Sequence, residues 1–336
     1  MSASRISDRL FLSLFVFAAF ATAHAGEGSG HVSLEGIGFL SEQPSPVSSS
    51  EGRGEIEYSR RWTYGDSLSL RLHPFLYGNS SDKTWERQVT VDPREAYLEF
   101  SHETFYLRAG YETLKFEGTD GLNPMDIASM KDLGDPLTSP TRASGGLHAG
   151  YSGEKFDFEA MYVPRQTESS LPGEKSPWWP RRTSLPLRTD DVEARLPDRV
   201  EYTIAPRREE NDALSNNVVA RLQYRSAYGD LALAGYEGAS QTPALHPVLN
   251  STLIQASPLV ILLLSPVQIV PIDYRVRTGS ALVSVPLGTW IVRVASRYDQ
   301  PLGDSRNNPS WSGQTVGGVE KTWEIGSNSV TTILQG

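Results

Sequence analysis

The sequence predicts an all-β fold, an antiparallel transmembrane β-barrel, and three observations indicate it. Residues 94–111 alternate strictly between apolar and other side chains, as two strands joined by a tight turn would. The same alternation recurs in pairs of segments along a chain of 336 residues that opens with an export signal. Long amphipathic patterns typical of helices are missing, whereas glycine and aromatic residues are plentiful and turn signals recur at short intervals.

The segment 94–111 is the clearest predicted hairpin. Its apolar residues share one face, namely Ala96, Leu98, Phe100, Phe105, Leu107, Ala109 and Tyr111. The charged residues Glu95, Glu99 and Arg108 share the other face. Because barrel strands alternate between lipid and lumen, we expect the apolar face to meet lipid and the charged face to meet water.

Residues 1–25 have the pattern of a signal peptide. Arg5 and Arg9 precede an apolar run from Leu10 to Phe20, and the segment closes on small residues up to Ala25. The apolar run is shorter than the ~20 residues that a membrane-spanning helix needs. We therefore expect cleavage after Ala25, a barrel domain over 26–336, and a location in the outer membrane of a Gram-negative cell.

Charge and composition exclude several functions. The net charge is −9, and removing the predicted leader, which carries +1, leaves −10, so nucleic acid is not an expected partner. There is no cysteine, which excludes disulfide and thiolate chemistry. We expect no cofactor, no metal and no catalytic residue. The partners expected of a barrel are outer-membrane lipid, lipopolysaccharide, the barrel assembly machinery and a small polar solute.

Alternating runs predict the remaining strands. In chain order the expected strands are 31–40, 52–62, 66–77, 94–101, 104–111, 147–152, 156–164, 218–224, 231–236, 272–285, 289–299, 313–322 and 328–335. The tripeptide Tyr-Gly-Asp recurs at 64–66 and 228–230 between two such runs, which indicates tight hairpin turns. We expect about 12 to 14 strands. Bacterial barrels close with an even number of strands and usually finish on an aromatic residue, whereas this chain stops on Gln335-Gly336, so we expect either a barrel whose closing strands are absent or a barrel with an atypical end.

Short turns alternate with long loops, which is the rim asymmetry of outer-membrane barrels. The turns at 152–155 and 286–288 are brief, whereas the long loops span 119–146, 165–215, 237–265 and 300–312. The apolar run from Pro258 to Pro271 is too short and too rich in proline for a membrane helix. It is expected to form a lipid-facing or rim strand, or a loop that packs into the lumen.

The loop that follows the hairpin is a candidate constriction. Asn123 is expected to cap a short helix with Pro124 at its first position. Four acidic residues gather in this loop, namely Asp120, Asp126, Asp132 and Asp135. Either the loop folds into the lumen and narrows it, or it is exposed with solvated carboxylates. The sequence leaves both readings open.

If the apolar residues of each predicted strand face the lipid, the residues that alternate with them line the lumen. They are Arg53, Glu55, Glu57, Arg61, Glu95, Glu99, Arg108, Arg221, Arg225, Arg275, Arg277, Arg293 and Arg297. Arginines outnumber carboxylates in this set, which favours the passage of anions. The alternative is that these side chains pair with each other and fill the interior, because barrel lumens are routinely charged.

A series of short motifs carries a resemblance. It consists of Arg94–Phe100, Tyr106–Tyr111, Gly118–Asp126, Asp135-Pro136, Gly150-Tyr151, Met161–Pro164, Leu171-Pro172 and Trp178. The series is similar to an uncharacterised family of porin-like outer-membrane barrels of Gram-negative bacteria, with alginate-export porins as more distant relatives. The resemblance covers 94–180 best, and it implies a passive or selective channel without catalytic residues.

Two other functions are compatible with parts of the sequence: a secreted or periplasmic β-sandwich that binds a ligand, and an outer-membrane barrel hydrolase. Residues 65–68 spell Gly-Asp-Ser-Leu, the signature of a family of serine esterases, but they open an alternating strand and no Asp-x-x-His follows near the C-terminus. The histidines after the leader, which are His31, His73, His102, His148 and His246, share no spacing with a nucleophile. We expect them at a rim or on the surface.

Overall fold

A computed structural model describes residues 28–38, 50–80, 89–116, 118–119, 122–134, 141–173, 176, 192–195, 202–248, 251–256, 260–264, 267–303, 310–325 and 328–335. Thirteen strands of this part form one sheet in which every neighbouring pair is antiparallel. In spatial order they are β1 (Gly28–Gly38), β2 (Ser50–Tyr64), β3 (Leu68–Asn79), β4 (Val89–His102), β5 (Phe105–Glu112), β8 (Ser144–Ser152), β9 (Phe156–Arg165), β13 (Ser215–Ser226), β14 (Gly229–Ala239), β19 (Arg275–Leu287), β20 (Trp290–Leu302), β21 (Ser312–Ile325) and β22 (Asn328–Gln335). Across these ranges, no helix is long and apolar enough to cross a membrane.

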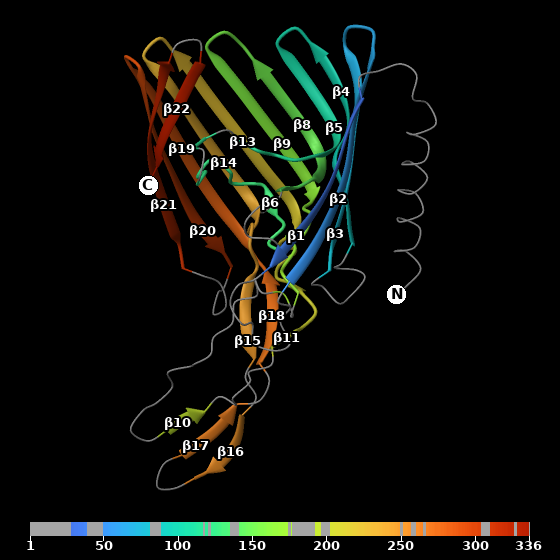
Figure 1. Ribbon diagram of the computed structural model, residues 1–336, viewed down its shortest axis with the longest axis vertical. Coiled ribbons are helices and arrows are strands. Elements are labelled where there is room, and N and C mark those ends of the chain that lie inside the picture. The colour runs from blue at the N-terminus through green and yellow to red at the C-terminus, as the bar shows by residue number, and fades with distance from the viewer. Residues whose placement is uncertain are drawn as a thin grey trace.

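The predicted fold class is confirmed, and every predicted strand overlaps one strand of the large sheet. Consecutive strands of the sheet are spatial neighbours throughout, so long-range pairing follows chain order. The sheet is a single curled layer and not the two stacked sheets of a sandwich (Figure 1). The expected leader, residues 1–25, lies outside the described residues.

Short turns lie at one end of the large sheet and long connections at the other, as Figure 1 shows. Gly65 has φ of +61° in the turn between β2 and β3, a conformation that glycine adopts without steric cost. Gly229 opens β14 in an equally tight place, since an added Cβ would lie 2.4 Å from the carbonyl oxygen of Ser284. Both glycines therefore belong to the tight turns that the sequence predicts.

The long connections carry further strands outside the large sheet. They are β6 (Met130–Lys131), β7 (Thr141–Arg142), β10 (Val192–Arg195), β11 (Tyr202–Ile204), β12 (Arg208–Glu209), β15 (Ala244–Val248), β16 (Ser251–Gln255), β17 (Val260–Leu264) and β18 (Val267–Asp273). The apolar run from Pro258 to Pro271 supplies β17 and β18, so it contributes no strand to the large sheet. These two strands pair in separate small sheets beyond the end of the large one (Figure 1).

The two faces of the large sheet have opposite character. On the outer face, Leu98, Ala109 and Leu147 are successive partners across β4, β5 and β8, and both leucines are exposed. On the inner face, Glu99, Arg108 and His148 are partners across the same strands, and Glu99 and His148 are buried. Exposed apolar and buried charged side chains reverse the pattern of a soluble protein. The outer face is therefore suited to an apolar surrounding.

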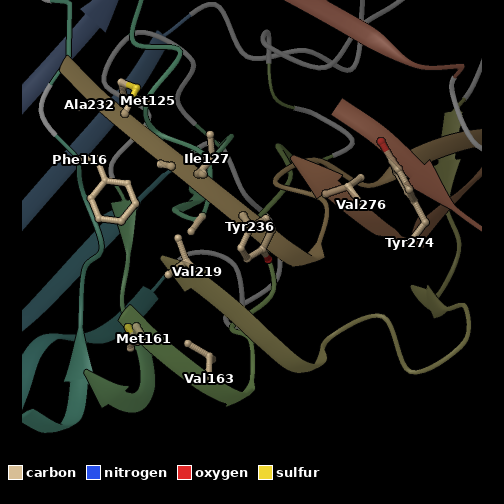
Figure 2. Close-up of a cluster of buried hydrophobic side chains, with 12 residues drawn as sticks. Phe116, Met125, Ile127, Met161, Val163, Val219, Ala232, Tyr236, Tyr274 and Val276 are labelled. Carbon is tan, nitrogen blue, oxygen red and sulfur yellow. The ribbon is translucent and has the colours of Figure 1, made fainter. Parts of the chain in front are cut away.

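An apolar cluster lies on the inner face of the sheet, where the chain after β5 packs against it. Figure 2 shows Met125 and Ile127 of this segment beside side chains from β9, β13, β14 and β19. The cluster comprises Phe116, Met125, Ile127, Ala128, Met161, Val163, Val219, Ala232, Ala234, Tyr236, Tyr274 and Val276. We call the described residues of 113–134 the inner segment. Met125 and Ile127 have no exposed surface, so the inner segment is fixed against the wall.

The short helix expected after Asn123 is absent, and Pro124 and Met125 form a turn instead. The Asn123 side chain accepts a hydrogen bond from the Met125 backbone N–H at 3.0 Å, and its own amide donates to the Phe116 carbonyl at 2.7 Å. An asparagine that bonds to the backbone in this way competes with the helix that it would otherwise cap. Burial of Met125 and Ile127 favours the turn.

The large sheet has two edges, β1 and β22, and no pairing joins them within the described residues. Val32 and Leu34 on β1 and Leu334 on β22 are exposed. Edge strands carry unpaired backbone groups that can accept another strand.

Candidate pore lining and inner segment

A chain of side chains that alternate between a base (arginine or histidine) and a glutamate crosses the inner face through six strands. Glu99 on β4 accepts hydrogen bonds from Arg61 of β2 and Arg108 of β5, each at 2.6 Å. The series continues through Arg108–Glu112 at 3.2 Å, Glu112–His148 at 2.9 Å, His148–Glu159 at 3.9 Å and Glu159–Arg221 at 3.3 Å. We call these seven residues the charge ladder. Cross-strand ion pairs at this spacing stabilise the sheet and keep its inner face polar.

A second charged cluster lies on the inner face of β2, β3 and β4. Arg94 donates to Glu57 at 2.8 Å and lies 3.9 Å from Glu55, and its guanidinium covers the Phe75 ring at 3.7 Å. His73 approaches the same Glu57 at 3.3 Å. The register of β3 and β4 shifts between His73 and Phe75, a bulge that turns Arg94 toward this face.

Glu95 completes this cluster by pairing with Arg71 and His73. Arg53 is buried and occupies the same face of β2 as Glu55, because every second residue of a strand lies on the same face.

Three further predicted lining residues, on β13 and β20, also form ion pairs with carboxylates. Arg225 pairs with Asp157 at 2.7 Å. Arg293 pairs with Glu320 at 2.6 Å, and Arg297 pairs with Asp299 at 2.8 Å. All these carboxylates lie one strand away or two residues along the same strand. None of these three carboxylates is among the predicted lining residues.

The prediction that Arg275 and Arg277 line the lumen was wrong, because both residues belong to the outer face. Arg277 is opposite Glu237 and donates to it at 2.7 Å, and it shares a face with Val283, which is exposed. Thr278, one residue on, is buried on the inner face. Arg275 donates to the backbone carbonyls of Ser215 and Asn216. The phasing failed because β19 begins at the rim with the long loops, where outer positions also carry polar residues.

The inner face holds arginine and carboxylate side chains in pairs. Each of Arg61, Arg71, Arg94, Arg108, Arg221, Arg225, Arg293 and Arg297 forms an ion pair with a carboxylate. Five carboxylates that were not among the predicted lining residues balance most of the predicted excess of arginine. They are Glu112, Asp157, Glu159, Asp299 and Glu320. An excess of arginine therefore does not follow from this face.

This pairing leads to a prediction for ion selectivity. Replacing Arg61, whose side chain is half exposed and pairs with Glu99, should raise the cation-to-anion permeability ratio by up to roughly tenfold, because a carboxylate loses its counter-charge in a polar enclosure. The same change at Arg277, on the outer face, should leave the ratio unaltered. Reversal potentials of the reconstituted Arg61→Ala and Arg277→Ala variants in a salt gradient measure both effects. An equal shift in the two variants would contradict the assignment of faces.

The acidic residues of the inner segment are engaged in internal contacts. Asp126 is buried and pairs with Lys131, and Asp132 accepts hydrogen bonds from Ser170 and from the Gly134 backbone N–H. Asp120 and Asp135 lie outside the described residues. Asp126 and Asp132 are therefore not the solvated cluster that one reading of the sequence expected.

Two glutamines outside the inner segment donate hydrogen bonds to its backbone carbonyls. Gln166, just beyond β9, donates to the Ala128 carbonyl at 3.1 Å, and Gln335 at the end of β22 donates to the Leu122 carbonyl at 2.9 Å. The pairing of β6 with β7 fixes Met130 and Lys131 opposite Arg142 and Thr141. The segment thus crosses the interior side of the sheet from β22 to β9.

An ion pair between Arg207 and Asp273 holds together the loops at the end of the large sheet that carries the long connections. Arg207 donates two hydrogen bonds to Asp273, both at 2.7 Å, and also bonds to Ser169. Burial raises the pKa of the Asp273 carboxyl, and the Arg207 guanidinium acts in the opposite direction. The pair joins the chain after β9 to β18, so its role is to hold these loops together.

Within the residues that the structure describes, no hydrogen bond joins a histidine to Ser67 of the esterase-like tetrapeptide. Ser67 lies in the turn before β3, and its carbonyl accepts a hydrogen bond from the Ser101 N–H. His148, expected at a rim, is buried in the middle of the inner face between Glu112 and Tyr106, whereas His31, His102 and His246 are exposed. Among the described residues, no group of His, Asp and Glu could hold a metal ion.

Sequence reasoning missed Glu112, His148 and Gln241 as residues of this site. Glu112 ends its strand and His148 stands among glycines, so neither belongs to a long alternating run. Gln241 follows β14 in a loop, where no periodic signal exists. Its hydrogen bonds go to the backbone of the inner segment, which is distant in the sequence, so they leave no local signal.

No protein-family model matches the chain, and no curated protein matches it. Among solved structures it is similar to OmpT, an outer membrane protein of Vibrio cholerae, at 11% identity and a TM-score of 0.43, covering 93% of this chain and 79% of that one. OccK2 (OpdF) of Pseudomonas aeruginosa, in complex with glucuronate, is similar at 11% identity and a TM-score of 0.43, covering 92% and 62%. A mutant porin of Rh. blastica is similar at 9% identity and a TM-score of 0.34, covering 93% and 94%.

At these identities and scores, the fold assignment rests on the strand register and burial pattern of this chain. The likeness to porin-like barrels and to alginate-export porins stays a prediction from the sequence.

Proposed function

We propose that the protein is an outer-membrane channel through which small polar solutes diffuse. The observation that carries the proposal is the reversal of the two faces of the sheet. Leu98, Leu107 and Leu222 are exposed on the outer face, whereas the inner face carries the charge ladder. An apolar band outside and a polar enclosure inside are what a strand barrel needs to conduct in a bilayer.

The polar path would run between the charge ladder and the inner segment. The alternating signs of the ladder create a field across the path, which orients dipolar solutes without a net preference for one sign of charge. The inner segment, packed against β9, β13 and β14, reduces the cross-section. The solutes that pass are therefore small and polar.

The proposal requires paired edges and export. Unpaired backbone groups in hydrocarbon cost several kcal/mol each, so β1 and β22 must find partner strands in the membrane. Export by the predicted leader, insertion by the barrel assembly machinery, and contact with lipid and lipopolysaccharide belong to the same proposal.

A role without catalysis is part of the proposal. His73 and His148 contact carboxylates and Tyr106, and in the described part of the chain neither is hydrogen-bonded to a serine or threonine hydroxyl. A nucleophile would need such a base. No observation among the described residues favours a hydrolase or a soluble binding module as a second function.

Reconstitution of the protein in planar bilayers tests the function. Detergent-extracted protein that migrates differently before and after heating, and that adds discrete, ohmic conductance steps, is the expected result. Protein that fractionates as soluble without detergent, or that folds in bilayers without conductance, contradicts the proposal. An inner-face variant such as Arg61→Ala should change selectivity in the same assay and so exclude leakage around the protein.

A further inference from the structure

Gln241 joins the inner segment to the wall through both ends of its side-chain amide. Its Nε2 donates to the carbonyl oxygens of Asp126 at 2.7 Å and Ser129 at 3.0 Å. Its Oε1 accepts from the Nη1 of Arg297 at 2.7 Å, and the same Nη1 donates to the Asp126 carbonyl at 3.2 Å. The side chains of Gln241 and Arg297 therefore bond to each other and both donate to the Asp126 carbonyl, which forms a ring of three hydrogen bonds.

Arg297 is held in the orientation that this ring needs. Its Nε lies 2.8 Å from both carboxylate oxygens of Asp299, and Thr278 donates to the same carboxylate at 2.6 Å. The Arg297 side chain is only 16% exposed. The alternation pattern predicts that this guanidinium lines the lumen, whereas in the structure it donates to the backbone of the inner segment.

The inner segment depends on these donors because it has no regular structure around Asp126. Asp126 and Ser129 are both buried, and a buried carbonyl without a partner costs about as much as a lost hydrogen bond. The apolar contacts of Met125 and Ile127 attract the segment to the wall but are not directional. Hydrogen bonds to named carbonyls fix where along the wall it lies.

We propose that Gln241 and Arg297 are positioning residues that hold the inner segment in register and thereby set the aperture through which polar solutes pass. This rests on the proposed channel function. Loss of the two donors of Gln241 should raise the population of a displaced inner segment on the order of tenfold, since each net hydrogen bond contributes modestly and two are lost together.

Gln241→Glu is the most selective test. The carboxylate is nearly isosteric and still accepts from Arg297, but it cannot donate to Asp126 or Ser129. Gln223→Glu is the matched control, because Gln223 occupies the inner face of β13 and accepts a hydrogen bond from Arg221, and it gives the carbonyls of Asp126 and Ser129 no donor. Both variants add the same charge to the interior, so a difference between them reports the lost donors.

Two readouts are needed: the frequency of conductance transitions in single channels, and amide hydrogen exchange over 122–131 in the folded protein. Gln241→Glu should raise both about tenfold while Gln223→Glu matches the wild type. If both variants match the wild type in exchange and conductance, the positioning role is overturned and the channel stands. If the wild type exchanges slowly but never conducts, the channel function and the aperture both fail. Should Gln241→Glu not fold, Arg297→Lys, which keeps the charge but loses the fork of donors, must show the same two increases.

Discussion

Deleting residues 120–135 is expected to raise the single-channel conductance several-fold. This stretch includes Met125 and Ile127, which anchor the inner segment on the interior side of β9, β13 and β14. Its removal leaves the strands of the large sheet in place, because neither β5 nor β8 pairs with it. The conductance of an ion path rises with its cross-section, so the narrowest part should widen. Planar bilayer recordings at fixed salt measure the change.

The matched control is deletion of residues 251–264, a stretch of similar length. It removes the hairpin of β16 and β17, which lies beyond the end of the large sheet (Figure 1). Conductance should then equal that of the wild type. Heat-modifiable mobility on gels establishes that both variants have folded. Equal conductance in the two deletions would show that the inner segment does not limit the path.

Leu222→Arg is expected to destabilise the protein folded in a bilayer by about 2 to 4 kcal/mol, the cost of an arginine on the lipid face near the midplane of a barrel. Leu222 lies in the middle of β13, is exposed on the outer face, and stands opposite Phe158 and Leu233 on the neighbouring strands. In water the same substitution of an exposed leucine would cost little. Urea titration of folding into lipid vesicles measures the difference.

Tyr228→Arg is the control for depth in the same titration. Tyr228 is exposed in the short turn between β13 and β14, at the end of the strands, where an arginine should cost about 0 to 1 kcal/mol. Similar costs at positions 222 and 228 would mean that the outer face of β13 meets a uniform solvent and not a bilayer.

The strands could be predicted because alternation is a local signal. Alternate residues are apolar or small in β4 (Ala96, Leu98 and Phe100) and again in β5 (Phe105, Leu107, Ala109 and Tyr111), and the register Leu98 to Ala109 follows from the short turn. The phase of β19 could not be predicted. Arg275 and Arg277 lie at a rim, where the outer face leaves the apolar band and polar side chains occur on both faces.

The inner segment shows where local reasoning ends. Asn123-Pro124 is a sound helix start by local preference, but burial of Met125 and Ile127 against strands far along the chain selects a turn. The partners of Asp126 illustrate the same limit. Arg297 is 171 residues away and Gln241 is 115 residues away, and only the packing of the inner segment against β14, β19 and β20 brings them together.

The assignment of the two faces is tested most directly by thiol labelling, which the absence of cysteine in the natural chain allows. Leu107 and Arg108 are neighbours on β5, and Leu107 is the more exposed, 43% against 27% for the Arg108 side chain. In protein folded into vesicles, a charged water-soluble thiol reagent should modify the Arg108→Cys variant faster than the Leu107→Cys variant, because lipid covers position 107 and water reaches position 108. Faster modification at position 107 would contradict the account, since it is the order that exposure to water alone would give.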